Sequence, residues 1–135
     1  MTRSGRFVFL LLLSGALLAG GSWAHTPPKP PAAPGVVHVV LVWLKDAGNA
    51  EHRQQVISGS KQLADIPGVL DLRVGTVIPS DRDVVDASYD VALYLRFASE
   101  ADLQAYLVHP THKTTVKEVF VPIMDHYRVM DFRDE

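Results

Sequence analysis

A tyrosine and two histidines stand close together near the C-terminal end of the chain, in the run from Tyr106 to His112. An imidazole exchanges protons readily near neutral pH, and a phenol can donate a hydrogen bond to an oxygen on which negative charge develops. Together they could remove a proton from a carbon next to a carbonyl group and stabilise the enolate that forms. Tyr106 and His112 are therefore the candidate catalytic residues.

Two helical patterns meet in this run and direct both side chains inward. Leu103, Tyr106 and Leu107 follow helical spacing, so Tyr106 belongs to an apolar face. Pro110 ends the first helix and suits the first turn of a second. His112 shares a stripe of that second helix with Val116, Val119, Phe120 and Ile123. The same placement also fits a purely structural pair that satisfies itself and the exposed helix-end carbonyls, with His109 as an N-cap.

The remaining elements predict an α+β domain. Strands are expected over residues 36–44, 69–78, 89–97 and 127–132, and helices over 50–65, about 99–108 and 110 to about 120. The order β-α-β-β-α-(α)-β is the split βαβ arrangement of a ferredoxin-like antiparallel sheet. Such a sheet carries its helices on one face.

The first strand is apolar on both faces, which predicts a partner for the open face. Val37, Val39, Leu41 and Trp43 alternate with His38, Val40, Val42 and Leu44. A domain of this size cannot cover both faces of its own sheet, so a second copy packed sheet to sheet is the simplest solution. We therefore predict a homodimer whose two sheets enclose an internal chamber.

The N-terminal 35 residues predict export. Arg3 and Arg6 precede an almost wholly apolar stretch, and Ser22 and Ala24 occupy the positions that a signal peptidase reads, so we place cleavage after Ala24. Residues 1–24 are then a signal peptide, residues 25–35 a proline-rich linker and residues 36–133 the folded domain. The expected location is periplasmic or secreted, with an uncleaved membrane anchor as the alternative.

Composition narrows the classes of function. The chain has no cysteine, which removes thiol nucleophiles, disulfides and zinc–cysteine sites. Loss of Arg3 and Arg6 takes the formal net charge from -2 to -4. A mildly acidic domain offers no electrostatic basis for binding nucleic acid or, after signal cleavage, an anionic membrane. We also expect no cofactor.

Six short segments resemble the stress-responsive α/β-barrel (Dabb) domain family. They are residues 37–42, 66–69, 89–90, 97–100, 106–112 and 130–132. The resemblance extends over about residues 36–132, and it implies a dimeric α+β barrel in which two ferredoxin-like sheets close around a shared interior. It implies little about activity, because function does not follow from fold.

The resemblance also suggests roles for individual residues. One plant member is a cyclase that closes a linear polyketide by aldol condensation, with a Tyr and the second His of a Tyr-x-x-His-Pro-x-His run as its acid–base pair. By that match the roles fall on Tyr106 and His112. The cyclase has a His in its first strand, where this chain has His38, and a His at the start of its third strand, where this chain has Asp90.

The candidate ligand-binding residues are His38, Asp90, Tyr94 and Arg73. His38 enters the site from the first strand, and Asp90 and Arg73 either pair across strands on the barrel side or line a wet cavity. We expect a binding or stress-protective module for a small apolar or carbonyl-containing ligand. The alternative is a lyase- or cyclase-type enzyme that transfers a proton with the tyrosine–histidine pair.

A metal site is a further alternative at the same run. His109 and His112 have a two-histidine spacing, and His38, Asp90 or Asp131 would have to supply a third ligand. The proline between the two histidines breaks the helix that would align their rings. No metal site is therefore assigned.

Overall fold

The computed structural model describes residues 34–135, so the predicted signal peptide and nearly all of the predicted linker lie outside the described residues. Four strands form one antiparallel sheet in the order β2-β3-β1-β4, where β1 is Gly35–Leu44, β2 is Val69–Thr76, β3 is Val91–Phe97 and β4 is Met124–Asp134. The helical segments are α1 (Ala50–Lys61), η1 (Gln62–Asp65), α2 (Glu100–Val108), α3 (Pro110–Thr115) and η2 (Val116–Phe120). The order and the pairing confirm the ferredoxin-like α+β fold.

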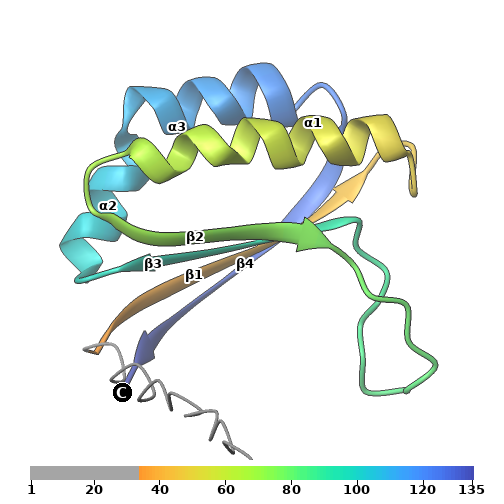
Figure 1. Ribbon diagram of the computed structural model, residues 1–135, viewed down its shortest axis with the longest axis horizontal. Helices are drawn as coiled ribbons and strands as arrows, with labels where there is room; N and C mark the ends of the chain where they lie inside the picture. Colours follow the sequence, from red (N-terminus) through yellow and green to blue (C-terminus); the bar gives the residue numbers. More distant parts are fainter. Residues whose placement is uncertain (1–33) are drawn as a thin grey trace, which may run out of the picture. The chain divides into compact units, whose positions relative to one another are not determined.

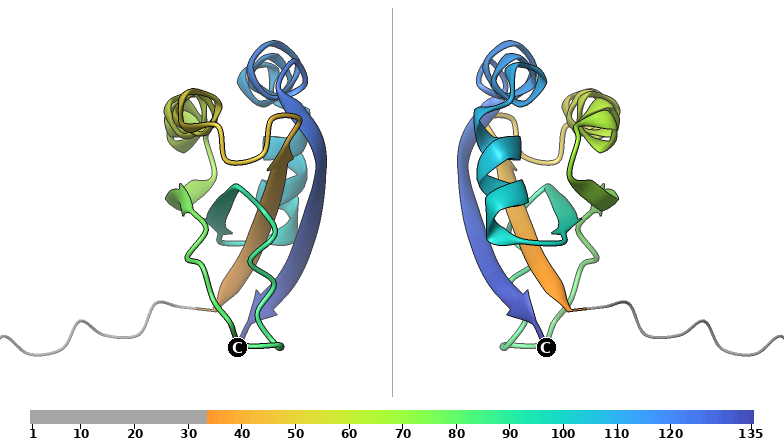
Figure 2. Two further views of the ribbon diagram at one scale, coloured as in Figure 1. Left: turned by 90° about the vertical axis from the view of Figure 1, so that its right-hand side faces the viewer. Right: turned by 90° about the vertical axis from the view of Figure 1, so that its left-hand side faces the viewer.

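The helices cover one face of the sheet. Figure 1 shows α1 and α3 running over the same side of the strands, and the end-on views of Figure 2 show the sheet beneath them. Within residues 34–135 the opposite face, here called the open face, carries no helix. None of the helices in this part of the chain is long and apolar enough to cross a membrane.

The hydrophobic core lies between the sheet and the helices. Val42 of β1 and Leu95 and Phe97 of β3 are completely buried, and Val56 of α1 packs against them. The helix starts follow local sequence: the Ser99 side chain accepts a hydrogen bond from the Asp102 amide and caps α2, as the sequence predicts. Burial of this one apolar layer fixes the sheet under the helices.

A β-bulge corrects the predicted faces of β2. Two residues of β2, Val69 and Asp71, are opposite two consecutive residues of β3, so Leu70 is an extra residue in the ladder. Val69 and Leu72 therefore pack against the core, whereas Leu70, which strict alternation would place on the same face as Leu72, is 57% exposed. Ile78 is exposed too, because β2 ends at Thr76.

The C-terminal segment differs in two ways from its prediction. The expected helix over 110 to about 120 is α3 followed by a π-helical turn, in which the Val121 amide donates to the Val116 carbonyl. The Lys45 ammonium group then binds the carbonyls of Val121 and Pro122. The last strand is longer than the predicted 127–132 because its whole length from Met124 pairs with β1.

Candidate functional site

A cavity of about 270 Å³ lies between the sheet and the helices of a single protomer. Its sheet wall is made of alternate residues of β1 and β4, and its helical wall comes from α2, α3, η1 and η2. Tyr127, which lines the cavity on the edge strand β4, is 58% exposed, so the cavity reaches the surface there. One chain alone forms this cavity, on the helix side of the sheet.

Tyr106 places a phenol at one end of this cavity. The last turn of α2 packs the ring against Phe97 of β3, with ring centroids 5.2 Å apart, and leaves the residue 2% exposed. Burial raises the pKa of Tyr106, so the hydroxyl stays protonated at neutral pH. Among residues 34–135 this hydroxyl has no hydrogen-bond partner, although it borders the cavity. It is therefore a donor available to a ligand.

His112 lies beside Tyr106, with ring centroids 4.6 Å apart. Its Nδ1 is 3.1 Å from the Leu107 carbonyl oxygen at the end of α2. Because a carbonyl oxygen only accepts hydrogen bonds, Nδ1 carries the proton and Nε2 of the neutral ring keeps its lone pair. Burial, with smaller effects from the nearby His38 and Lys113, lowers the pKa of His112 against the opposing effect of the Leu107 carbonyl. The ring is thus a neutral acceptor at pH 7.

His38 completes the polar end from the sheet side. Its ring centroid is 6.1 Å from that of Tyr106, and the residue is 4% exposed. Nδ1 of His38 is 2.6 Å from Oδ1 of Asp131, which is directly opposite it in the β1–β4 ladder. The carboxylate fixes the orientation and tautomer of the imidazole, as a second-layer acid does for many functional histidines. Tyr106, His112 and His38 are therefore brought together as expected.

The other three predicted ligand-binding residues are not brought to this cavity. Tyr94 of β3 is directly opposite both Val39 and Arg73, which places Tyr94 and Arg73 on the open face. Arg73 pairs with Asp71 on its own strand at 3.0 Å. Tyr94 and Arg73 therefore do not line the cavity with His38, because successive side chains of a strand point to opposite faces of the sheet.

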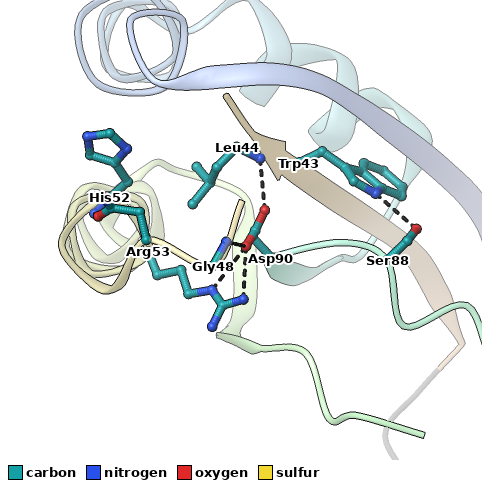
Figure 3. A network of polar contacts seen from close by, with 8 residues as sticks. Trp43, Leu44, Gly48, His52, Arg53, Ser88 and Asp90 are labelled. Atoms are coloured by element: carbon teal, nitrogen blue, oxygen red, sulfur yellow. Dashed lines mark hydrogen bonds and ion pairs between the residues drawn. The ribbon is translucent and has the colours of Figure 1, made fainter. Parts of the chain in front are cut away.

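Asp90 has a structural position at the end of the sheet (Figure 3). Its carboxylate accepts hydrogen bonds from the amides of Leu44 and Gly48, at 2.9 and 2.7 Å, and from the guanidinium group of Arg53, at 2.9 Å. Gly48 has φ +80°, a conformation that glycine adopts without strain. Burial raises the pKa of Asp90, but these hydrogen bonds and the Arg53 charge outweigh it and lower the pKa overall. The residue thus holds the loop between β1 and α1.

His109 and His112, the two histidines of the possible metal site, form hydrogen bonds with different partners. His109 caps α3, since its Nδ1 accepts a hydrogen bond from the Thr111 amide. His112 points to the cavity and binds the Leu107 carbonyl instead. Within residues 34–135 no group of three or more His, Cys, Asp or Glu side chains is arranged to hold a metal ion.

Asp131 is a cavity residue that the sequence analysis considered only as a possible third metal ligand. The structure makes it the hydrogen-bond partner of His38 at the cavity. The alternation of Asp131, Val129 and Tyr127 on β4 carried the signal, because all three line the cavity. Only the register with β1 shows which histidine the carboxylate meets.

These features define a class: a ferredoxin-like α+β domain with a partly polar cavity between its sheet and its helices. Residues 36–134 match the family described as the stress responsive A/B barrel domain, and the chain belongs to that family. A curated relative from Arabidopsis thaliana, described as a stress-response A/B barrel domain-containing protein, is 28% identical over 116 residues that make up 86% of this chain. The chain spans 43% of the length of that relative.

Two solved structures illustrate the range of proteins with this fold. One is a dimeric ferredoxin-like protein of unknown function from Thermobifida fusca, with a TM-score of 0.59, 24% identity, and coverage of 74% of this chain and 91% of that one. The other is a hydroxynitrile lyase from Passiflora edulis, with a TM-score of 0.64, 22% identity, and coverage of 78% of this chain and 96% of that one. At these identities the likeness is one of fold.

Proposed function

We propose that this protein is an exported, homodimeric module that binds one small organic molecule in the cavity of each protomer. The observation that carries the proposal is a buried polar cluster facing an open space. The Tyr106 hydroxyl and Nε2 of His112 border the cavity, and no residue among 34–135 forms a hydrogen bond with either. Both atoms therefore stay accessible from the cavity, and a ligand bound there can form hydrogen bonds with them.

The homodimer is supported by the open face. Val39 and Leu41 of β1 are only partly covered, and Met130 and Phe132 of β4, which face the same way, are 44% and 53% exposed. An apolar strip of this kind is stable in water when a second sheet covers it. The dimeric description of the Thermobifida fusca protein agrees with this arrangement. Export rests on the N-terminal sequence alone.

The direct test is ligand binding with matched tyrosine variants. Small-molecule fragments would be screened against the purified protein by NMR, following the ring signals of His112. Tyr106→Phe removes only the hydroxyl, and we expect it to weaken the best fragments about fivefold, the effect of one hydrogen bond. Tyr89→Phe is the control, because Tyr89 packs on Trp43 and does not line the cavity. Equal affinities of the two variants, or no fragment perturbing His112, would refute the proposal.

A lyase-type enzyme is the second candidate, and the protonation pattern favours it specifically. A neutral imidazole with a free Nε2 can accept a proton, while the protonated phenol of Tyr106 can donate to a developing oxyanion. The Passiflora edulis relative is described as a lyase. An enzyme of this kind would catalyse hydrogen–deuterium exchange next to the carbonyl of a bound ketone, and His112→Ala would abolish the exchange. A binding module would show no exchange above that of buffer.

A further inference from the structure

The cavity is polar at one end and apolar along the rest of its length. On β1, His38 is followed on the same face by Val40 and Val42, and the residues opposite them on β4 are Asp131, Val129 and Tyr127. Tyr106 and His112 gather at the His38 end. A ligand that satisfies both ends must itself be polar at one end and apolar at the other.

Apolar residues line the far end of the cavity, where the sheet and the π-helical turn meet. Phe120, at the end of η2, and Met124, at the start of β4, both line the cavity. Met124 is opposite Leu44, so this end lies beyond Val42 along β1. The four residue-to-residue steps from His38 to Val42 span about 13 Å at about 3.3 Å per step. A volume of about 270 Å³ over that length makes a narrow channel.

The charges of the polar end favour a neutral ligand. No lysine or arginine lines the cavity in the described part of the chain. The His38–Asp131 pair carries a net charge of minus one when the imidazole is neutral and of zero when the imidazole is protonated. A carboxylate would enter beside Asp131 without a compensating cation, and an uncompensated buried charge is strongly unfavourable.

The hydrogen-bonding groups favour a hydroxyl as the head of that ligand. The Tyr106 hydroxyl can donate to its oxygen, and Nε2 of neutral His112 can accept its proton, since Nδ1 is committed to the Leu107 carbonyl. A hydroxyl satisfies both groups at once. A carbonyl oxygen only accepts and leaves Nε2 without a partner.

We infer that the cavity binds a neutral, linear alcohol of about eight carbons, with its hydroxyl between Tyr106 and His112 and its tail toward Met124. The chain length follows from geometry: an extended chain advances about 1.2 Å per bond, so eight carbons and one oxygen cover about 10 Å and fill the channel once atomic radii are added. The inference rests on the proposed ligand-binding function and specifies the ligand class.

The test compares 1-butanol, 1-hexanol, 1-octanol and octanoate by isothermal titration calorimetry at pH 8. We expect the affinity of the alcohols to rise about fourfold per added methylene group. Octanoate should bind at least tenfold more weakly than 1-octanol. Asp131→Asn keeps the shape of the side chain and removes its charge. It should reduce the difference in affinity between 1-octanol and octanoate.

A pair of Val→Phe variants tests the direction of the tail. Val40→Phe places a larger side chain in the middle of the channel and should weaken 1-octanol more than 1-butanol. Val108→Phe is the control, because Val108 is 62% exposed on α2 and does not line the cavity. Alcohol affinities that do not depend on length, or octanoate binding as tightly as 1-octanol, would overturn the inference and leave a ligand site of another specificity. If no fragment of any kind perturbs His112, the proposed function fails as well.

Discussion

Replacing Asp90 with asparagine should lower the free energy of unfolding by about 2–3 kcal/mol at pH 7. The Asp90 side chain is 3% exposed, and its two oxygens accept from the Leu44 and Gly48 amides and from Arg53. An asparagine side chain offers one oxygen and one NH₂ group, so one of these donors faces another donor. The Arg53 charge also loses its partner.

The magnitude follows from how far this pair is removed from water. Breaking a fully buried ion pair from one side costs about 3–5 kcal/mol. The Arg53 side chain is 28% exposed, so water recovers part of its solvation and the expected loss is smaller. The loss acts on the loop between β1 and α1, and not on the cavity, because Asp90 does not line it.

The pH dependence distinguishes a charge effect from a general packing defect. The pKa of Asp90 is lower in the folded protein than its unfolded value of about 3.9, so its contribution to stability is present above that value and is lost as the pH falls through the folded pKa. The free energies of unfolding in urea of the wild type and of Asp90→Asn should therefore differ most at neutral pH and become similar at acidic pH. The control is Asp86→Asn, which replaces an exposed carboxylate that accepts a hydrogen bond from the Ser88 hydroxyl. A stability gap that is absent at pH 7, or that stays constant down to pH 3, would refute the reasoning.

Three further predictions concern other parts of the molecule. Because burial depresses the pKa of His112, the unfolded state binds a proton at a higher pH than the folded state does. This residue should therefore lower the stability as the pH falls below about 6.5. The melting temperature of His112→Gln should decrease less between pH 7.5 and 5.5 than that of the wild type. Met130→Asp should convert the dimer to a monomer in sedimentation velocity, whereas Val108→Asp, on exposed α2, should not. N-terminal sequencing of the protein expressed in a bacterial host should find His25 as the first residue, and a sequence starting at residue 1 or 2 would contradict export with cleavage.

The sequence was sufficient to predict the fold and the convergence of three site residues. Apolar alternation marks β3 and helical spacing of apolar residues marks α1 and α2, whereas β1 is recognised as a β-branched run that is apolar on both faces. Tyr106 and His112 were placed correctly because each shares a stripe with apolar neighbours that must face the core. Their chemical role stays a prediction.

The features that the sequence did not reveal depend on how neighbouring strands pair. Alternation divides the side chains of β2 and β3 between two faces, but it does not show which set lies on the same face as His38. A shift of one residue in the strand pairing exchanges the two sets. The sequence alone therefore did not show that Arg73 and Tyr94 lie on the face opposite His38. The bulge after Val69 has the same origin, since an extra residue in a ladder is visible only against its partner strand.

In the proposed function, the two faces of β1 carry separate properties, ligand binding on one face and assembly on the other. His38, Val40 and Val42 face the cavity, and the residues between them, Val39 and Leu41, face the open side, where Met130 adds exposed apolar surface. The cavity walls come entirely from one chain, so a second copy is not required to form the polar end. A monomeric Met130→Asp variant should therefore keep its affinity for a cavity ligand while losing stability, because the two properties depend on side chains that point in opposite directions. Loss of ligand affinity on dissociation would mean instead that the partner holds β4 and Asp131 in place.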